Sequence, residues 1–257
     1  MYGADDPWLW RGQANGSFAL EPGMHTRVRR NASLDDETVT MYTEGLIEAA
    51  RRAELDIHES TRLPDMALLA LLQHHGAATP LLDVSLDPMV GLYMAIVSPD
   101  PADDDKPGAL FAIRRPNLTI ADFDSRSFRH VYEWIGNEVA FYSAPDVSQR
   151  LRIQRGHFLI GPVSTTNSRT TIPLTIDPGT ASDNWIGRRM AGRGTKAPPP
   201  RATSDVGVFR IAPTFKPVIR TWLEERSGLT RDFVFPTAWH QPYLERFAAS
   251  HGRGASF

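Results

Sequence analysis

The sequence predicts a single α+β domain across residues 1–257, and three observations support this. First, short strand-like segments and helical segments follow one another along the chain, with no internal repeat. Second, a chain of 257 residues is long enough to bury a sizeable core without disulfide bonds. Third, residues 178–205 are rich in Gly, Pro, Arg and Ser, and the chain after them is too short to form its own core easily. We therefore interpret this segment as a flexible, basic insertion within the domain.

Two short strands and a long helix are expected in the first sixty residues. The aromatic run Trp8–Trp10 is typical of a buried strand. The Asn15-Gly16 pair that follows indicates a turn, and Phe18–Leu20 can return as a second short strand. Ser33 is a suitable N-cap for a helix that continues to about Ile57, because acidic residues occupy its first turn and an apolar stripe follows.

The next forty residues predict two helices around a short buried segment. The first helix covers 65–73 and ends before Gly76, a residue suited to a helix C-terminus. Leu81-Leu82-Asp83 fits a short buried segment. The second helix covers 87–97, because Pro88 is favourable in the first turn of a helix.

The remaining chain predicts four strands and two helices. The strands are expected at 109–113, 150–160, 170–176 and 206–211, and the helices at 216–227 and 241–249.

Composition excludes several classes of protein. Cysteine is absent, which excludes disulfide scaffolds, thiol nucleophiles, iron–sulfur clusters and cysteine-rich zinc sites. The formal net charge of −2 is not that of a protein that binds nucleic acid through bulk charge. The N-terminus lacks the basic and apolar regions of a signal peptide, and no apolar run approaches the roughly 20 residues that span a bilayer. We expect a soluble, cytoplasmic protein.

Arg11 is the first candidate for a functional residue. It lies at the end of the first predicted strand, next to Gly12, where the backbone can come close to a bound group. A guanidinium at this place can hold a phosphate with two hydrogen bonds, as a dinucleotide pyrophosphate requires. A surface salt bridge, or stacking on a neighbouring tryptophan, explains the residue equally simply.

The densest polar cluster follows the helix at 65–73. Gln73-His74-His75-Gly76 is followed by Thr79, Asp83 and Ser85, in a neighbourhood that is otherwise apolar. Such residues can form a functional site at the end of an element, or they can cap the helix and satisfy loop amides. Adjacent histidines on a helix point about 100° apart, so no metal site is predicted here.

Gln154 provides a further polar candidate. We expect it on a strand, followed by Arg155 and Gly156. Its amide can bond a ribose hydroxyl or the edge of a base, although the polarity of an exposed strand face explains it as well.

Several segments, which together cover most of the chain, resemble the FRG domain, a family named after a Phe-Arg-Gly motif. Trp10-Arg11-Gly12-Gln13 stands at the signature position. The segment Gln73–Ser85 resembles the family's most diagnostic block, and 152–158 and 216–236 resemble later elements. Pro80, Val84, Ser85 and Met94 stand where the family pattern has Arg, Trp, Thr and Phe.

The family arrangement is similar to that of ADP-ribosyltransferases, which implies a split mixed β-sheet core flanked by helices, with a cleft for NAD. In this mapping Arg11 would hold the NAD phosphates, Ser85 with Thr79 would support the nicotinamide ribose, and Gln154 would orient the ribose or acceptor. Asp83 would be either a compensating carboxylate or a cap. The catalytic set that the resemblance implies is Arg11, Ser85, Gln154 and Asp83, and the NAD-binding set is Arg11, Gly12, Gln13, His74, His75, Thr79 and Tyr93.

The leading hypothesis is therefore a NAD-dependent ADP-ribosyltransferase or NAD glycohydrolase, acting as a bacterial or phage toxin or defence effector. The expected partners are NAD as substrate, a nucleic-acid or protein acceptor and an antitoxin, with no membrane. One alternative is a non-catalytic module that binds a nucleotide or a partner. The other is a nucleic-acid-binding protein or nuclease that uses His74, His75, Asp83 and the basic insertion.

Overall fold

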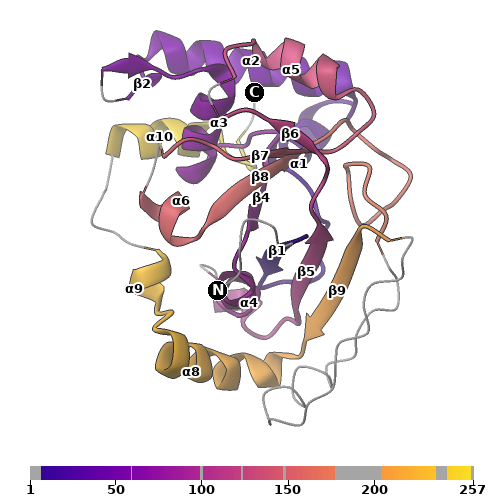
Figure 1. Ribbon diagram of the computed structural model, residues 1–257, viewed down its shortest axis with the longest axis vertical. Coiled ribbons are helices and arrows are strands. Elements are labelled where there is room, and N and C mark those ends of the chain that lie inside the picture. Colours follow the sequence, from indigo (N-terminus) through magenta and orange to yellow (C-terminus); the bar gives the residue numbers. More distant parts are fainter. Residues whose placement is uncertain are drawn as a thin grey trace. The chain divides into compact units, whose positions relative to one another are not determined.

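The computed structural model describes residues 7–58, 60–98, 101–122, 124–146, 149–176, 204–235 and 242–255. These residues form helices and a mixed set of strands, so the predicted α+β class is confirmed (Figure 1). Most of the predicted insertion lies outside the described residues.

The chain divides into two compact units, each assembled from three stretches of sequence. Unit 1 comprises Met1–Ala19, Val84–Arg115 and Leu174–Pro236, and unit 2 comprises Leu20–Asp83, Pro116–Pro173 and Thr237–Phe257. The expectation of one domain across 1–257 stays a prediction.

Unit 1 is built on antiparallel strands. They are β1 (Trp8–Gln13), β5 (Gly108–Arg114), β9 (Val206–Ile211) and the end of β4 (Leu82–Ser85). β5 pairs with β1 on one side and with β9 on the other, and β1 also pairs with β4 at Trp10 and Ser85. β1 is thus held by partners on both edges, so its backbone has a fixed position.

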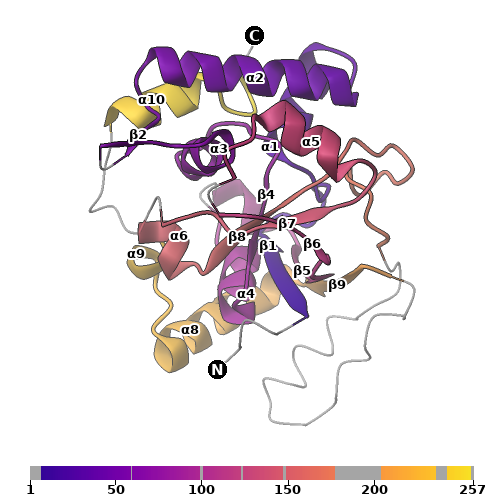
Figure 2. The same cartoon turned by 45° about the horizontal axis from the view of Figure 1, so that its top comes forward.

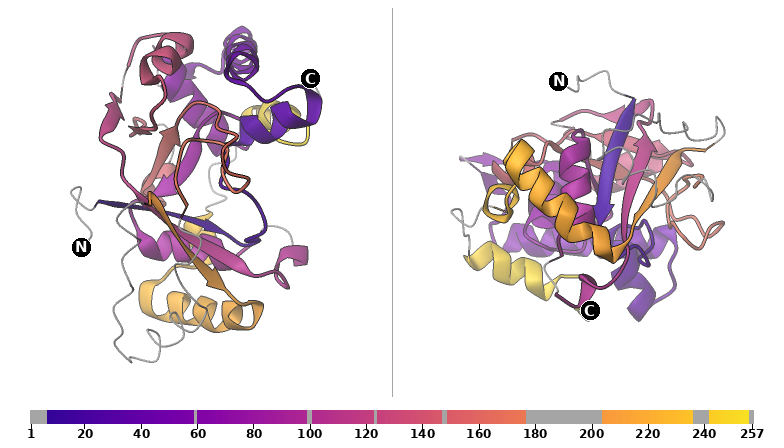
Figure 3. Two further views of the ribbon diagram at one scale, coloured as in Figure 1. Left: turned by 90° about the vertical axis from the view of Figure 1, so that its right-hand side faces the viewer. Right: turned by 90° about the horizontal axis from the view of Figure 1, so that it is seen from below.

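Two helices cover one face of these strands. α4 (Pro88–Ile96) packs on β1 and β5, and α8 (Lys216–Ser227) packs on α4 (Figure 3). The Asp87 side chain caps α4 by accepting a hydrogen bond of 2.9 Å from Met89 N. The contact buries an apolar core that includes Tyr93, Ile96, Leu110, Phe209 and Leu223. Unit 1 also contains η1 (Pro101–Asp103), η2 (Pro213–Phe215) and α9 (Arg231–Val234).

Unit 2 combines a small mixed sheet with six helices among its described residues. β6 (Leu118–Ile120) runs parallel to β7 (Ala140–Tyr142), which pairs antiparallel with β8 (Gly156–Ile160). A separate hairpin is formed by β2 (Ile57–His58) and β3 (Thr61–Arg62). The helices are α1 (Gly23–Asn31), α2 (Asp36–Arg52), α3 (Asp65–His74), α5 (Phe128–Ile135), α6 (Gln149–Ile153) and α10 (Pro242–Ser250).

α3 is the central helix of unit 2. All of its residues from Asp65 to Leu72 are buried, which is typical of a helix that is enclosed on every side. α2 and α10 both pack against it, and Figure 2 shows α2 running along the outside of α3 with α5 alongside.

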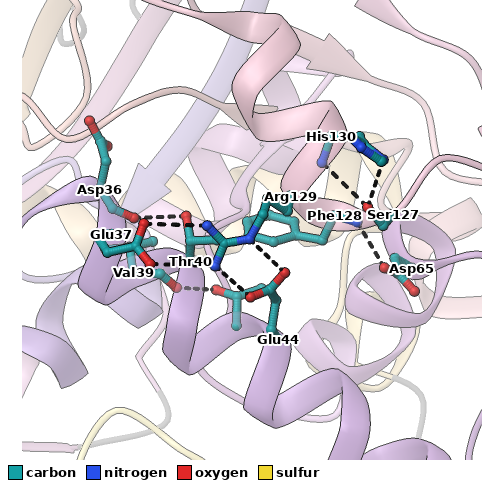
Figure 4. A network of polar contacts seen from close by, with 11 residues as sticks. Asp36, Glu37, Val39, Thr40, Glu44, Asp65, Ser127, Phe128, Arg129 and His130 are labelled. Carbon is teal, nitrogen blue, oxygen red and sulfur yellow. Dashed lines mark hydrogen bonds and ion pairs between the residues drawn. The ribbon is translucent and has the colours of Figure 1, made fainter.

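Charged side chains join α5 to its neighbours (Figure 4). The Arg129 guanidinium donates to Glu44 at 2.7 and 3.0 Å and to Glu37 at 3.3 Å. The buried Asp65 carboxylate accepts from Phe128 N at 2.8 Å and from Arg51 Nη2 at 2.5 Å. Asp65 therefore fixes the beginning of α5 against the beginning of α3.

Most predicted elements are confirmed, with some corrections. The long helix begins at Asp36 and its N-cap is Asp35, not Ser33, because the Asp35 carboxylate accepts from Thr38 N at 2.8 Å. The expected strand at 18–20 is reduced to an isolated bridge between Leu20 and Thr170. The expected strand at 170–176 likewise shows only this bridge and another, from Ile176 to Val206.

The expected strand at 150–160 is wrong in its first half. Residues 149–153 form α6, and only Gly156–Ile160 form a strand. Two apolar residues that alternate with polar ones, as Leu151 and Ile153 do, fit a helical turn as well as a strand. So short a pattern does not distinguish a helix from a strand.

No described helix combines the length and the apolar composition needed to cross a bilayer.

Candidate functional site

Arg11 lies in the middle of β1 and is half-buried. It is paired with Phe111 of β5, while its neighbour Trp10 is paired with Ser85 of β4. Because side chains alternate along a strand, Arg11 and Gln13 point to one face of the sheet and Trp10 points to the other. Trp10 packs into the core beneath α4, so Arg11 and Gln13 face away from that helix.

Gly12 allows α4 to approach β1 closely. A Cβ atom at Gly12 would lie 2.0 Å from Gly91 O and 2.3 Å from Ala95 N. On the helix, a Cβ atom at Gly91 would in turn lie 2.9 Å from the Cβ of Trp10. The glycine of the signature is therefore required for the packing of a helix, which fixes the strand that carries Arg11.

Ser85 points to the face opposite Arg11. Directly paired residues of antiparallel strands share a face, so Ser85 lies with Trp10. The Ser85 hydroxyl accepts a hydrogen bond of 3.0 Å from Asp87 N, in the turn that leads into α4. Within unit 1, the structure thus brings Arg11 and Gln13 together and separates Ser85 from them.

Tyr93 belongs to the core of unit 1. Its side chain is fully buried, and its ring centroid lies 6.4 Å from that of Phe235. Burial, with the nearby charge of Glu224, raises the pKa of the Tyr93 hydroxyl. The membership of Tyr93 in the NAD-binding set stays a prediction.

In unit 2, Gln73 connects two predicted site residues. Its Nε2 donates to Asp83 Oδ2 at 2.8 Å, and its Oε1 accepts from the Thr79 hydroxyl at 2.7 Å. Thr79 Oγ1 also accepts from Leu81 N at 3.2 Å, so the chain of bonds reaches the backbone. Thr79 is fully buried and Asp83 is exposed. The exposed Asp83 carboxylate is thus held by the Gln73 amide, which is held in turn by the buried Thr79 hydroxyl.

The loop that carries Thr79 is held by segments from both ends of unit 2. Ala78 N donates to His251 O at 2.8 Å, and Met24 N donates to Thr79 O at 2.9 Å. The buried guanidinium of Arg27 donates to the same His251 carbonyl at 3.2 Å. Burial lowers the pKa of Arg27. The C-terminal turn after α10 therefore fixes the backbone next to Thr79.

His74 and His75 form an edge-to-face pair at the end of α3. Their ring centroids are 5.0 Å apart and their planes are almost perpendicular. Among the described residues, no three His, Asp or Glu side chains are arranged to hold a metal ion. The two imidazole rings thus contact each other at the end of α3.

Gln154 does not lie on a strand, in contrast to the prediction. It lies between α6 and β8 and is half-buried. The next residue, Arg155, has a φ of 45°, in the left-handed region, as the chain turns into β8. The predicted role of Gln154 at the ribose or acceptor stays a prediction.

A cavity of about 290 Å³ in unit 1 is lined by other residues. Asp104, Asp105 and Arg220 lie around it together with Lys216, and none of the predicted site residues lines it. The Lys216 ammonium donates to Ala14 O and Asp103 O at 2.8 and 2.7 Å, and burial lowers its pKa. Lys216 thus connects the backbone at Ala14 to the backbone at Asp103.

Gln73 is the residue that sequence reasoning missed as a site member. It belongs to the polar block, but the residues of that block that were expected to act are His74, His75, Thr79, Asp83 and Ser85. The signal that could have found it is its amide, which can donate to a carboxylate and accept from a hydroxyl at the same time.

Comparison with known families gives one match. Residues 6–104 match the model of the FRG domain. This confirms the predicted resemblance, and the match includes Arg11–Gln13 and Gln73–Ser85 but ends before Gln154. Comparisons with curated proteins and with solved structures found no match. The likeness to ADP-ribosyltransferases therefore stays a prediction.

Proposed function

We propose, from the premise that residues 6–104 are an FRG domain, that this protein binds NAD and breaks the bond between its nicotinamide and ribose. The ADP-ribosyl group then passes to water or to a nucleic-acid or protein acceptor. The proposal includes a role as a bacterial or phage toxin or defence effector, which follows from the family resemblance alone.

One observation carries the proposal: Arg11 is held rigidly in the middle of a paired strand. Both edges of β1 are hydrogen-bonded, and the close approach of α4 at Gly12 fixes the strand from one face. Because the backbone of Arg11 is already ordered in this way, ligand binding costs only the rotamer entropy of its side chain. Its planar fork matches two phosphate oxygens, which supports a pyrophosphate as the anchor.

The reaction requires little from the protein beyond positioning and charge. The C1′–N bond breaks and its electron pair goes to the pyridinium nitrogen, which becomes neutral as nicotinamide leaves. The C1′ carbon acquires oxocarbenium character and then bonds to an oxygen or nitrogen of the acceptor, which loses a proton. Fixed phosphates favour this transition state, because they hold the reacting C1′ carbon in place.

Incubation of the purified protein with labelled NAD tests the proposal. We expect release of nicotinamide, with label transferred when lysate protein or nucleic acid is added. Arg11→Ala should lower kcat/KM by roughly 10- to 100-fold, the scale of one charge-assisted bond. Arg226→Gln is the matched control, because Arg226 is exposed on α8 outside the matched segment, and it should behave as wild type. Binding of NAD without turnover would instead indicate a non-catalytic module, and neither binding nor turnover would contradict the proposal.

A further inference from the structure

Four exposed arginines lie around α1 in unit 2. Arg29 and Arg30 belong to the last turn of the helix. Arg253 follows α10, and its side chain lies against the glycine that begins α1, because a Cβ atom at that glycine would be 3.1 Å from the Arg253 Nε. Arg169 lies beside the chain that leads into α1, since its carbonyl accepts from Leu20 N at 2.8 Å. These four arginines are called the α1 basic surface below.

Most of the positive charge of the α1 basic surface is not compensated. Arg29 pairs with Glu21 at 2.6 Å. Of the described side chains, Glu21 is the only carboxylate that pairs with any of the four arginines, so the surface combines four positive charges with one negative charge. Six other arginines of the same unit do pair with carboxylates, at 2.5–2.9 Å, and they are Arg51, Arg52, Arg62, Arg126, Arg129 and Arg152.

Two of the four guanidinium groups are ordered by neutral contacts. Arg30 Nη1 donates to the Arg253 carbonyl at 3.3 Å, and the Arg253 side chain packs against the beginning of α1. A carbonyl orders a guanidinium without cancelling its charge, and it leaves the other N–H groups able to donate. α1 also has neither a capping side chain nor an acidic residue in its first turn, so the positive end of its dipole adds to the charge of Arg253.

The residue types of this surface favour a partner that is rich in phosphate. All four cations are arginines, and the planar guanidinium matches two oxygens of one phosphate. Among the described residues, no exposed Phe, Tyr or Trp lies in α1, at 251–255 or at 164–171. Proteins that bind single strands stack the bases on aromatic side chains, whereas a duplex presents dense rows of phosphates and no free bases. A duplex therefore fits this surface better than a single strand.

We propose that the α1 basic surface binds the phosphate backbone of a nucleic-acid duplex. Contacts to phosphates position a protein on a duplex without reading its bases, so we expect no preference among duplexes of different sequence. This binding goes beyond the proposed cleavage of NAD and does not require it.

Fluorescence anisotropy with a labelled DNA duplex, measured without NAD at about 50 to 200 mM salt, tests the proposal. For the wild-type protein we expect log Kd to rise linearly with the logarithm of the salt concentration, by about 0.9 for each phosphate contacted. Arg30→Gln combined with Arg253→Gln removes two contacts. This double variant should lower the slope by about 1.8 and weaken binding roughly 10- to 60-fold at about 0.1 M salt.

Arg52→Gln combined with Arg152→Gln is the matched control. It removes the same charge from the chain, but each of its arginines is paired with a carboxylate, Glu48 or Asp146. We expect the slope of the wild-type protein and an affinity within about 2-fold of it. The melting temperatures of both double variants show whether they fold. If the variant without Arg30 and Arg253 is unfolded, the two single variants replace it, and each should lower the slope by about 0.9.

Two results would overturn the proposal directly: no binding at the lowest salt concentration, or equal slopes for the wild-type protein and the variant without Arg30 and Arg253. Tighter binding of a single strand than of the duplex would also overturn it. Displacement of the duplex by poly-glutamate as readily as by unlabelled duplex would indicate an acidic protein instead. Duplex binding without release of nicotinamide from NAD would support this surface and contradict the proposed reaction, and release of nicotinamide without duplex binding would do the reverse.

Discussion

Gln73 Nε2 lies 2.8 Å from Asp83 Oδ2, and the other end of the same amide accepts the Thr79 hydroxyl. The end of α3 and the beginning of β4 are thereby connected through one side chain. The Gln73 nitrogen donates and its oxygen accepts, so the two partners fix the orientation of the amide.

Gln73→Leu should remove both bonds at once. The buried Thr79 hydroxyl loses its acceptor, so we expect the free energy of unfolding to fall by about 1–2 kcal/mol in urea denaturation. Gln73→Glu keeps an acceptor for the Thr79 hydroxyl but places a second carboxylate beside Asp83. The loss in free energy of unfolding of this variant should therefore become smaller as the pH is lowered. Equal stability of the Leu variant and the wild-type protein would show that the bonds contribute nothing.

Gly12→Ala should prevent normal packing of unit 1. The new Cβ would lie 2.0 Å from a backbone oxygen of α4, which cannot move aside as a flexible side chain can. We expect a loss of several kcal/mol or failure to fold, detected by circular dichroism and chemical denaturation. Gly45→Ala is the control, because nothing lies within 4 Å of its Cβ position in the exposed part of α2. That variant should gain roughly 0.5–1 kcal/mol from helix propensity.

His25 should make the protein less stable in acid. Burial, aided by the charge of Arg29, lowers the pKa of this imidazole from 6.5 to about 3. Its Nδ1 lies 2.8 Å from the Thr171 hydroxyl, and its Nε2 is buried with no partner among the described residues. Between pH 6.5 and 3 the unfolded chain binds a proton that the folded protein does not, so stability falls as the pH falls through this range.

The expected size of this effect is about 2 kcal/mol between pH 7 and pH 5. Urea denaturation of the wild-type protein and of His25→Gln at both pH values measures it. The variant loses the titrating group, so the difference in pH dependence between the two proteins should be of this size. Identical pH profiles would contradict the lowered pKa of His25.

The hydrogen bonds of Asp65 should contribute more to the free energy of unfolding than the partly exposed ion pairs of Arg129 do. Asp65→Asn removes the charge that binds Arg51 and weakens the bond to Phe128 N, so we expect a loss of about 2 kcal/mol. Glu44→Gln weakens a pair that is partly exposed and should cost less than about 1 kcal/mol. Thermal denaturation of both variants in parallel measures the difference, and a larger loss for Glu44→Gln would contradict it.

Local signals in the sequence were sufficient for many elements. Pro88 after Asp87 marks the beginning of α4, and the helix predicted at 216–227 is α8. These signals depend only on neighbours in sequence, such as capping side chains and apolar periodicity. α5 was missed although it carried such a signal, because Phe128, Val131, Tyr132 and Ile135 are its buried residues at helical spacing.

The faces of the candidate site could not be predicted. Which side of the sheet a residue occupies depends on strand register, and a shift by one residue exchanges the faces. The pairing of Trp10 with Ser85 joins positions 75 residues apart, and no local pattern specifies it. The resemblance placed Arg11 and Ser85 in one pocket, whereas this register puts their side chains on opposite faces.

The affinity of the full chain for NAD, measured by calorimetry on the wild-type protein, Arg11→Ala and the control Arg226→Gln, tests the central claim most directly. We predict that wild type and Arg226→Gln bind equally, that Arg11→Ala binds roughly 10- to 100-fold more weakly, and that the melting temperature of Arg11→Ala changes little. Unchanged affinity in Arg11→Ala, or a loss of affinity that merely follows a loss of folding, would contradict the assignment of Arg11 to the phosphates.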